Sequence, residues 1–251
     1  MQEDKDIKLY KKRFAELANT CYYKGYPIYT DFLDLKQQTI FKQMQQELPN
    51  VNCLSWGGTA LAERKMICFS NDFLSEDAFP IKTVKIQPQN VKFAEKLTHR
   101  DFLGAILNLG MDRCKLGDIL LDHQVAYAFI EENLADFLLY SLEKVKHTKV
   151  SCEIVDGKFQ FEQKFKEIVG TVNSIRLDAI LAVAFHSSRT QLLKLISSGK
   201  IYINGCLVEN NSYHLKEGDL VSVRGMGKFM YMAERDKTKK GKTKILLRMY
   251  I

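Results

Sequence analysis

Apolar residues recur along this chain with two different spacings, and the two spacings predict different elements. A repeat of three and four residues marks one face of a helix, whereas alternation marks a half-buried strand. The helical repeat predicts helices over residues 8–19, 35–48, 98–109, 131–145, 177–185 and 189–196. Short apolar runs bounded by turn residues predict strands over residues 51–56, 66–69, 84–87, 118–121, 124–130, 148–155, 201–203 and 220–223.

The middle of the chain has the element order strand, helix, strand, strand, helix, strand. This is the order of the ferredoxin-like plait, which RNA-recognition modules also use. Residues 156–173 contain alternating Phe159 and Phe161 together with two glycines, and they predict an irregular connector or hairpin. The aromatic pair Tyr127 and Phe129 could stack on bases, but core residues or residues covered by a helix are the favoured interpretation.

The last third of the chain combines two helices with strong turn signals. Ser188 and Gln191 form a capping-box pattern at the start of the second helix, and Gly199 stands where that helix should end. Asn204-Gly205 predicts a tight hairpin turn, and the run from Glu217 to Asp219 predicts another.

The net charge of +7 is concentrated in this last third. From Thr171 to the C-terminus, 14 Lys and Arg stand against 6 Asp and Glu, a balance of +8. The first 170 residues contain 23 basic and 24 acidic residues, a balance of −1. A segregated basic module is typical of a protein that binds a polyanion, although a basic domain without such a ligand is the alternative.

The remaining composition argues against metal, membrane and secretion. The six cysteines form no C-x-x-C pair, so we expect reduced thiols, no metal site and no cofactor. The sequence contains no run of 18 apolar residues, so it predicts no membrane span. The charged N-terminus lacks the apolar core of a signal peptide. We therefore expect a cytoplasmic protein.

Several basic residues stand where helices begin, and helix N-termini favour phosphate. Arg176 precedes the first helix of the basic module and Arg189 opens the second, while Lys194 and Lys200 follow on the same module. For Arg176 the alternative is a salt bridge to Asp178, and for Arg189 a purely solvated side chain. The basic run 237–244, with Lys239 and Lys240, is either a solvated loop or an arm that contacts phosphate.

The motifs of this stretch resemble the RNA-binding domain of small-subunit ribosomal protein S-four. They are R-L-D-x-x-L from Arg176, S-R-T ending at Thr190, L-I-x-x-G-K-I-x-I-N-G ending at Gly205, and E-G-D-x-V-x-V from Glu217. The resemblance covers about fifty residues. It implies contacts with structured RNA at Arg176, Arg189, Thr190, Lys194, Lys200, Asn204 and Gly205.

Motifs along nearly the whole chain are similar to those of the bacterial YlmH family. Examples are Trp56-Gly-Gly58, Ala62-Glu-Arg-Lys65, Lys115-Leu-Gly-Asp-Ile-Leu120 and Lys239-Lys-Gly-Lys-Thr-Lys244, with Trp56 where the family often has Phe. The predicted class is α+β, with a small N-terminal α/β domain (1–75), a ferredoxin-like plait expected to bind RNA (80–157), and an S-four-type αL RNA-binding domain with a basic C-terminal arm (174–251). The resemblance implies binding to rRNA of the large ribosomal subunit and to tRNA, in rescue of stalled translation and ribosome-associated quality control.

The main alternative is an RNA-modifying enzyme that uses the same basic module, as pseudouridine synthases do. The R-L-D of this chain lies inside the basic module rather than in a separate catalytic domain, and the sequence shows no nucleophile–base pattern. We expect no catalytic residue and no enzyme activity. A protein adaptor that binds an acidic partner is a third possibility. Away from the ribosome we expect a monomer.

Overall fold

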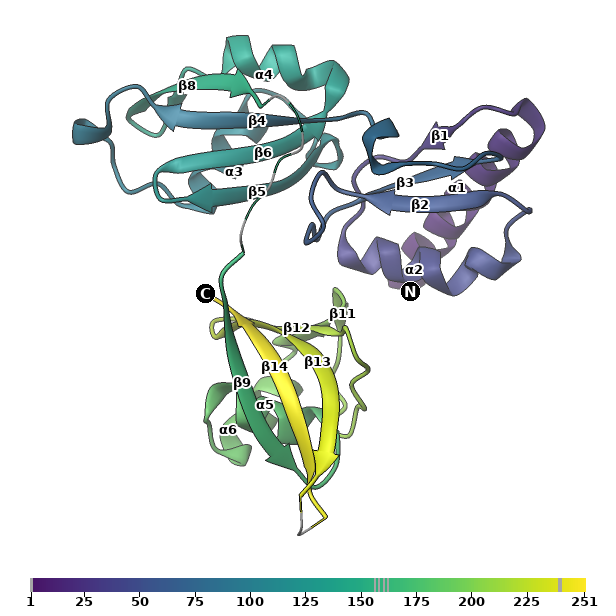
Figure 1. Ribbon diagram of the computed structural model, residues 1–251, viewed down its shortest axis with the longest axis vertical. Helices are drawn as coiled ribbons and strands as arrows, with labels where there is room; N and C mark the ends of the chain where they lie inside the picture. Colours follow the sequence, from purple (N-terminus) through teal and green to yellow (C-terminus); the bar gives the residue numbers. More distant parts are fainter. Residues whose placement is uncertain (1, 156, 158, 160, 162, 239–240) are drawn as a thin grey trace. The chain divides into compact units, whose positions relative to one another are not determined.

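The computed structural model describes residues 2–155, 157, 159, 161, 163–238 and 241–251, and the side chains of residues 2, 3, 189 and 233–237 fall outside the described part. The chain divides into two compact units, the N-terminal unit Met1–Phe161 and the C-terminal unit Glu162–Ile251 (Figure 1). Each unit mixes helices with antiparallel sheet, as the predicted α+β class requires. We describe the two units separately.

The N-terminal unit begins with helices packed on one face of a small sheet. Its first elements are α1 (Gln2–Lys24), β1 (Ile28–Tyr29), α2 (Leu35–Met44), the 3-10 turn Gln45–Glu47, β2 (Asn52–Trp56) and β3 (Met66–Ser70). The sheet order is β1-β3-β2. Phe14 of α1, Phe41 of α2 and Phe69 of β3 meet in the core between the helices and the sheet. Asp34 caps α2 through a capping box with Gln37.

A five-stranded sheet forms the rest of this unit and has the predicted plait. Its elements are β4 (Ile81–Pro88), α3 (His99–Asn108), β5 (Leu116–Asp122), β6 (Val125–Glu131), α4 (Ala135–Ser141), β7 (Lys144–Val145) and β8 (Thr148–Ile154), with short 3-10 turns between them. The sheet order β5-β6-β4-β8-β7 places the first strand between the third and the last, as in ferredoxin-like folds, with β7 added at the edge. Helices α3 and α4 cover one face, where Phe102, Ile106 and Leu138 are buried.

The predicted helix over 131–145 was too long. The helix proper covers only Ala135–Ser141, and residues Lys144–Val145 form strand β7. The apolar residues Leu142 and Val145 continue the helical spacing, but they bury themselves as a loop and a strand residue in the same core. Apolar spacing alone does not separate a helix end from a short edge strand.

The C-terminal unit is a six-stranded sheet with two helices on one face. Its elements are β9 (Phe165–Val172), α5 (Leu177–Phe185), α6 (Arg189–Ser197), β10 (Ile201–Ile203), β11 (Cys206–Leu207), β12 (Leu220–Val223), β13 (Gly227–Lys237) and β14 (Thr243–Tyr250). The sheet order is β11-β10-β12-β13-β14-β9. Leu177, Leu181 and Leu192 of the helices pack on Val221, Phe229 and Leu247 of the sheet.

One prediction about this unit was wrong. Residues 165–172 are not an irregular connector, because β9 pairs with β14 from Val172 against Thr243 to Phe165 against Tyr250. The ends of the basic run 237–244 belong to the β13–β14 hairpin, where Lys237 pairs with Thr243, and the run stays a proposed phosphate contact. In β9, at the edge of the sheet, the inward positions Ile168, Gly170 and Val172 alternate with exposed ones. The exposed apolar Val169 obscures this alternation in the sequence.

Candidate RNA-binding site

The first helix of the C-terminal unit begins at a bent polar segment. Arg176 is the N-cap of α5, and its Nε lies 3.3 Å from Oδ1 of Asp178. The same carboxylate oxygen accepts a 3.0 Å hydrogen bond from the backbone N–H of Ala179. The salt bridge that was the structural alternative for Arg176 is therefore formed, while 39% of the arginine side chain stays exposed.

The second helix presents its polar face to solvent. Ser188 is the N-cap of α6, and its hydroxyl accepts a 3.4 Å hydrogen bond from the backbone N–H of Gln191. Thr190 and Lys194 are exposed one turn apart, and they line a shallow hollow together with Glu209. The backbone of Arg189 opens the helix, but its side chain lies outside the described part.

One loop, residues 209–214, contacts both of these helix starts. The backbone N–H of Leu177 donates to the carbonyl of Tyr213 over 2.9 Å, and that of Asp178 donates to Asn211 over 3.3 Å. Asn211 also lines the hollow beside Thr190 and Lys194. Residues 209–214 thus adjoin both helices, and we call Arg176, Thr190, Lys194 and this loop the helix–loop surface.

A second basic cluster lies where α6 leads into the sheet. Lys200 is exposed directly before β10, and its carbonyl accepts a hydrogen bond from the backbone N–H of Arg224. The exposed Arg224 places its guanidinium carbon 4.6 Å from the centre of the Tyr202 ring. Arg224 was not among the predicted site residues. The available signal in the sequence was its position directly after the alternating run 220–223, which predicts a strand. In the fold, the end of that strand lies beside Lys200.

Asn204 and Gly205 form the predicted hairpin turn between β10 and β11. Both have positive φ, 49° and 76°, as a two-residue turn of this type needs. The Asn204 amide donates over 2.7 Å to Oδ1 of the buried Asp219, and its oxygen accepts from the backbone N–H of Leu220 over 3.0 Å. The Asn204 side chain is therefore engaged inside the fold and holds the second turn at Asp219.

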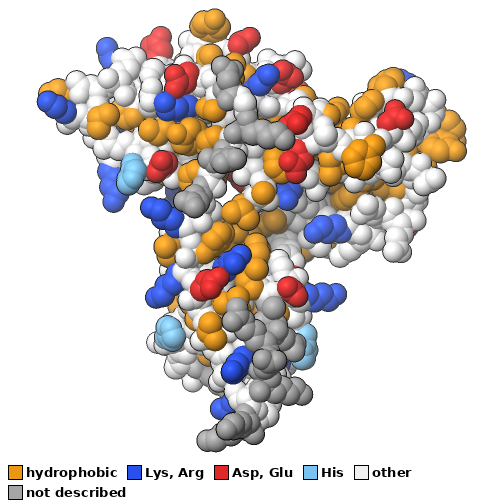
Figure 2. All heavy atoms as spheres, viewed as in Figure 1, with side chains coloured by type: hydrophobic (Ala, Val, Ile, Leu, Met, Phe, Trp, Pro, Cys, Tyr) orange, Lys and Arg blue, Asp and Glu red, His pale blue; other side chains and the backbone are white. Residues whose placement is uncertain are grey.

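The last two predicted site residues, Lys239 and Lys240, lie outside the described residues. Beside them, Lys242 and Lys244 are exposed at the tip and side of the β13–β14 hairpin. On the sheet face that α5 and α6 leave uncovered, hydrophobic, basic and acidic side chains are interspersed (Figures 1 and 2). The basic residues of this unit are therefore spread over several faces rather than gathered on one.

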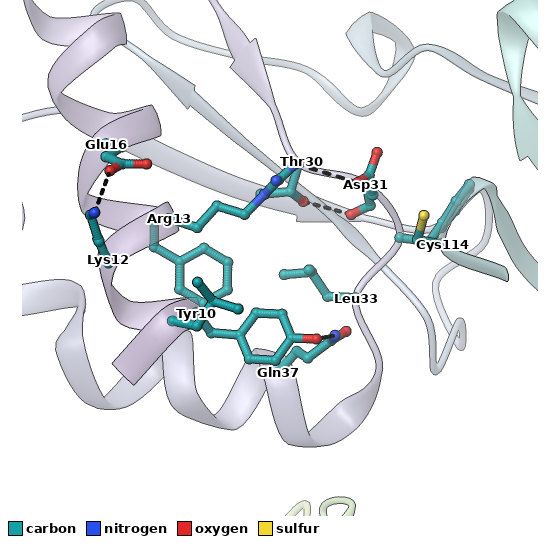
Figure 3. Close-up of a pocket in the computed structure, with 12 residues that line it drawn as sticks. Tyr10, Lys12, Arg13, Glu16, Thr30, Asp31, Leu33, Gln37 and Cys114 are labelled. Carbon is teal, nitrogen blue, oxygen red and sulfur yellow. Dashed lines mark hydrogen bonds and ion pairs between the residues drawn. The ribbon is translucent and has the colours of Figure 1, made fainter. Parts of the chain in front are cut away.

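The N-terminal unit contains a pocket of about 410 Å³ beside α1 (Figure 3). Arg13 reaches toward Asp31 at 3.5 Å, and Tyr10 accepts a 2.6 Å hydrogen bond from the amide of Gln37. Asp31 also pairs with Lys115 of the plait at 2.8 Å. Burial raises the pKa of the Cys114 thiol at the pocket wall, which keeps the thiol protonated and poorly nucleophilic. These polar groups connect the helices to the plait.

The motifs of the N-terminal unit also join its two sheets. The guanidinium of Arg64 donates to the carbonyls of Phe32, Leu116 and Arg113, at distances of 2.8, 3.0 and 3.3 Å. The Asp118 carboxylate accepts from the backbone N–H groups of Glu63 and Arg64. Burial lowers the pKa of both Arg64 and Arg113, the latter to about 10. These residues therefore have structural roles.

Within the described residues, no group of three His, Cys, Asp or Glu side chains is arranged to hold a metal ion. Among the described helices, none has the length and apolar composition needed to cross a bilayer.

Comparison with known proteins follows the same division of the chain. Residues 75–159 match the family described as "Putative RNA-binding domain in YlmH", and residues 175–221 match the S4 domain family. Fold and sequence together thus define an RNA-binding protein that joins a plait to an S4 domain. The chain belongs to the YlmH family.

The relative that shows this membership is the "Ribosome-associated protein quality control protein P2" of Bacillus subtilis (strain 168). It is 31% identical over 221 residues, which cover 86% of this chain and 84% of that protein. A solved structure, "Cell division protein ylmH from Streptococcus pneumoniae", covers 60% of this chain and 91% of its own, with a TM-score of 0.50. At 22% identity, that likeness concerns the fold alone.

Proposed function

We propose that this protein binds rRNA of the large ribosomal subunit and tRNA, and that it acts in the rescue of stalled translation in the cytoplasm. The S4 domain match and the ribosome-associated quality control protein of Bacillus subtilis to which the chain is similar support this proposal. The protein would act by binding, without a cofactor or catalytic residue, and as a monomer when it is off the ribosome.

The observation that carries the proposal is the helix–loop surface of the S4 domain. It brings Arg176, Thr190 and Lys194 around one loop, on a unit that has the whole excess of positive charge. Helix starts offer free N–H groups to phosphate, and arginine adds two parallel donors. Lys200, Gly205, Lys239 and Lys240 remain proposed contacts, and Asn204 would contribute through its turn backbone.

The test is the double change Arg176→Ala and Arg189→Ala in the full chain. Each lost charged hydrogen bond to phosphate is worth roughly 1.5–3 kcal/mol, so ribosome binding should weaken by about two orders of magnitude. Co-sedimentation with purified large subunits measures this, and thermal denaturation should show nearly unchanged stability. The matched control is Lys8→Ala with Lys12→Ala, which removes two charges from α1 and should leave binding unchanged.

The Arg176–Asp178 pair allows a sharper version of this test. The change Asp178→Asn removes the internal competitor for the guanidinium, so a phosphate-binding Arg176 should bind the ribosome more tightly. If Arg176 serves only the fold, Asp178→Asn will lower the melting temperature and leave binding unchanged. That result, or normal binding by the double alanine variant, would reject the assignment.

A further inference from the structure

The sheet face that RNA-recognition plaits use for base stacking is covered here by other residues of the same chain. Phe129, in the middle of β6, is fully buried. A Cβ on Gly58 would lie 2.2 Å from its ring, so the backbone of the β2–β3 connection rests on that ring. The ring of Phe159 lies 4.7 Å from that of Tyr127 on the same strand. Aromatic stacking of RNA bases, the usual mode of such plaits, would have to displace these contacts.

The edge of the plait sheet formed by β7 carries basic side chains. The short strand β7 is the edge strand of the sheet, and it pairs Lys144 directly with Lys149 of β8. Both lysines are exposed, whereas the neighbouring Val145 and Val150 are buried. Like charges at directly opposite positions destabilise a strand pair. Within the described part of the chain, no acidic side chain forms an ion pair with either lysine.

Further cations from α3 and the segment before it adjoin this edge. Arg100, Lys144 and Lys146 line one shallow hollow between α3 and the β7 segment. The backbone N–H of Glu95 donates to the Thr148 hydroxyl over 3.2 Å, and this contact brings the exposed Lys96 to the same end. We call this set the basic edge: Lys96, Arg100, Lys144, Lys146 and Lys149.

Acidic residues at the basic edge offset only part of its charge. Asp101 is occupied by Lys146 at 2.8 Å and by the Thr98 cap of α3. Glu95 is half-buried and Glu143 is exposed in the same hollow. Five cations therefore stand against three carboxylates, in a unit whose overall charge is close to balance.

We propose that the basic edge binds the phosphate backbone of RNA and is a second RNA contact of this protein. The proposal rests on the proposed function, because it adds a contact to the same RNA-bound state. Lysine is a compact point charge on a flexible stem, which suits phosphate contact without base readout. The contact would be electrostatic, insensitive to sequence and sensitive to salt.

A simpler role for these lysines is protection of the sheet edge. Lysines on an edge strand prevent its free backbone groups from pairing with a second chain. Edge protection does not explain why two lysines stand directly opposite each other. It also does not explain the presence of Lys96 and Arg100, which lie outside the strand. It predicts self-association of a variant without the lysines, together with unchanged RNA binding.

The test uses the full chain and the triple change Lys96→Gln, Lys144→Gln and Lys149→Gln. Binding to a fluorescein-labelled RNA duplex of arbitrary sequence is measured by fluorescence anisotropy over a range of salt concentrations. The matched control, Lys5→Gln with Lys8→Gln and Lys12→Gln, removes the same charge from exposed positions of α1. The Arg176→Ala and Arg189→Ala variant reports on the S4 domain separately.

The basic-edge variant should bind about tenfold more weakly, with a salt dependence that is shallower by roughly two units of log–log slope. The control should bind like the unmodified chain. Equal binding by the basic-edge variant and the control overturns the inference, and a loss seen only in the arginine variant then leaves the proposed function standing. No binding by the unmodified chain overturns the inference, while the proposed function is then decided by co-sedimentation with large subunits. Self-association with intact RNA binding assigns the lysines to edge protection alone.

Discussion

At the scale of single residues, sequence motifs identify positions better than they identify roles. The motif around Asn204 predicted a turn and an RNA contact, and the turn is confirmed by its positive φ angles. The side chain, however, bonds to Asp219 and Leu220, which are separated from it by more than a dozen residues. Arg176 similarly pairs with Asp178. A sequence shows which side chains are near in the chain, but not which hydrogen-bond partners folding brings to them.

We predict that Asn204→Ala destabilises the C-terminal unit by about 2 kcal/mol or more. It leaves the buried Asp219 carboxylate without its amide donor and places alanine at φ 49°. Asn204→Asp should be worse, because it sets two carboxylates against each other. Thermal denaturation followed by circular dichroism measures both. Stability equal to that of the unmodified chain in either variant would show that the amide is not structural.

At the scale of elements, alternation and turn residues predicted most strands and helices, including α5, α6 and the β10–β11 hairpin. Strand β9 was missed because its pairing partner, β14, lies at the other end of the unit in sequence. The N-terminal boundary of the S4 unit, expected at 174, therefore excludes a strand that pairs along the whole of β14.

This pairing predicts how fragments of the chain behave. A fragment of residues 163–251 should unfold cooperatively, because it keeps all six strands of the sheet. A fragment of residues 174–251 lacks β9, exposes the edge of β14 and loses the buried Val172, so it should melt at a lower temperature or not fold. Circular dichroism of the two fragments makes the comparison. Identical melting curves would show that β9 contributes nothing to the unit.

The Trp56-Gly-Gly58 motif lies in the β2–β3 connection, which packs against Phe129 of strand β6. Gly58 combines φ of 91° with a backbone that touches the Phe129 ring. We predict that Gly58→Ala destabilises the N-terminal unit by more than about 2 kcal/mol, through strain and overpacking together.

Gly25→Ala is the matched control for Gly58→Ala. Gly25 has φ of 75° but nothing within 4 Å of its added Cβ, so only the backbone strain, about 1 kcal/mol, should appear. Thermal denaturation of the full chain separates the two effects. Equal losses in the two variants would mean that the contact with Phe129 carries no stability.

At the scale of the whole molecule, the charge distribution along the sequence pointed to the C-terminal third and concealed the basic edge of the plait. The first 170 residues nearly balance, so an average over them shows no basic region. Folding brings Lys96 and Arg100 beside residues 144–149, from which they are separated by more than forty residues in the sequence. Charge segregated along the chain is visible in a sequence, whereas charge gathered by topology is not.

The central claim, that this protein works by binding ribosomal RNA, is tested most directly by crosslinking in cells. Ultraviolet crosslinking of the full chain, followed by sequencing of the bound RNA and mapping of the crosslinked peptides, identifies both partners of each contact. We predict crosslinks to large-subunit rRNA and tRNA, with peptides from the S4 domain around 176–205. Crosslinks confined to unrelated RNA, or an absence of RNA above the level of the Arg176→Ala and Arg189→Ala variant, would contradict the account.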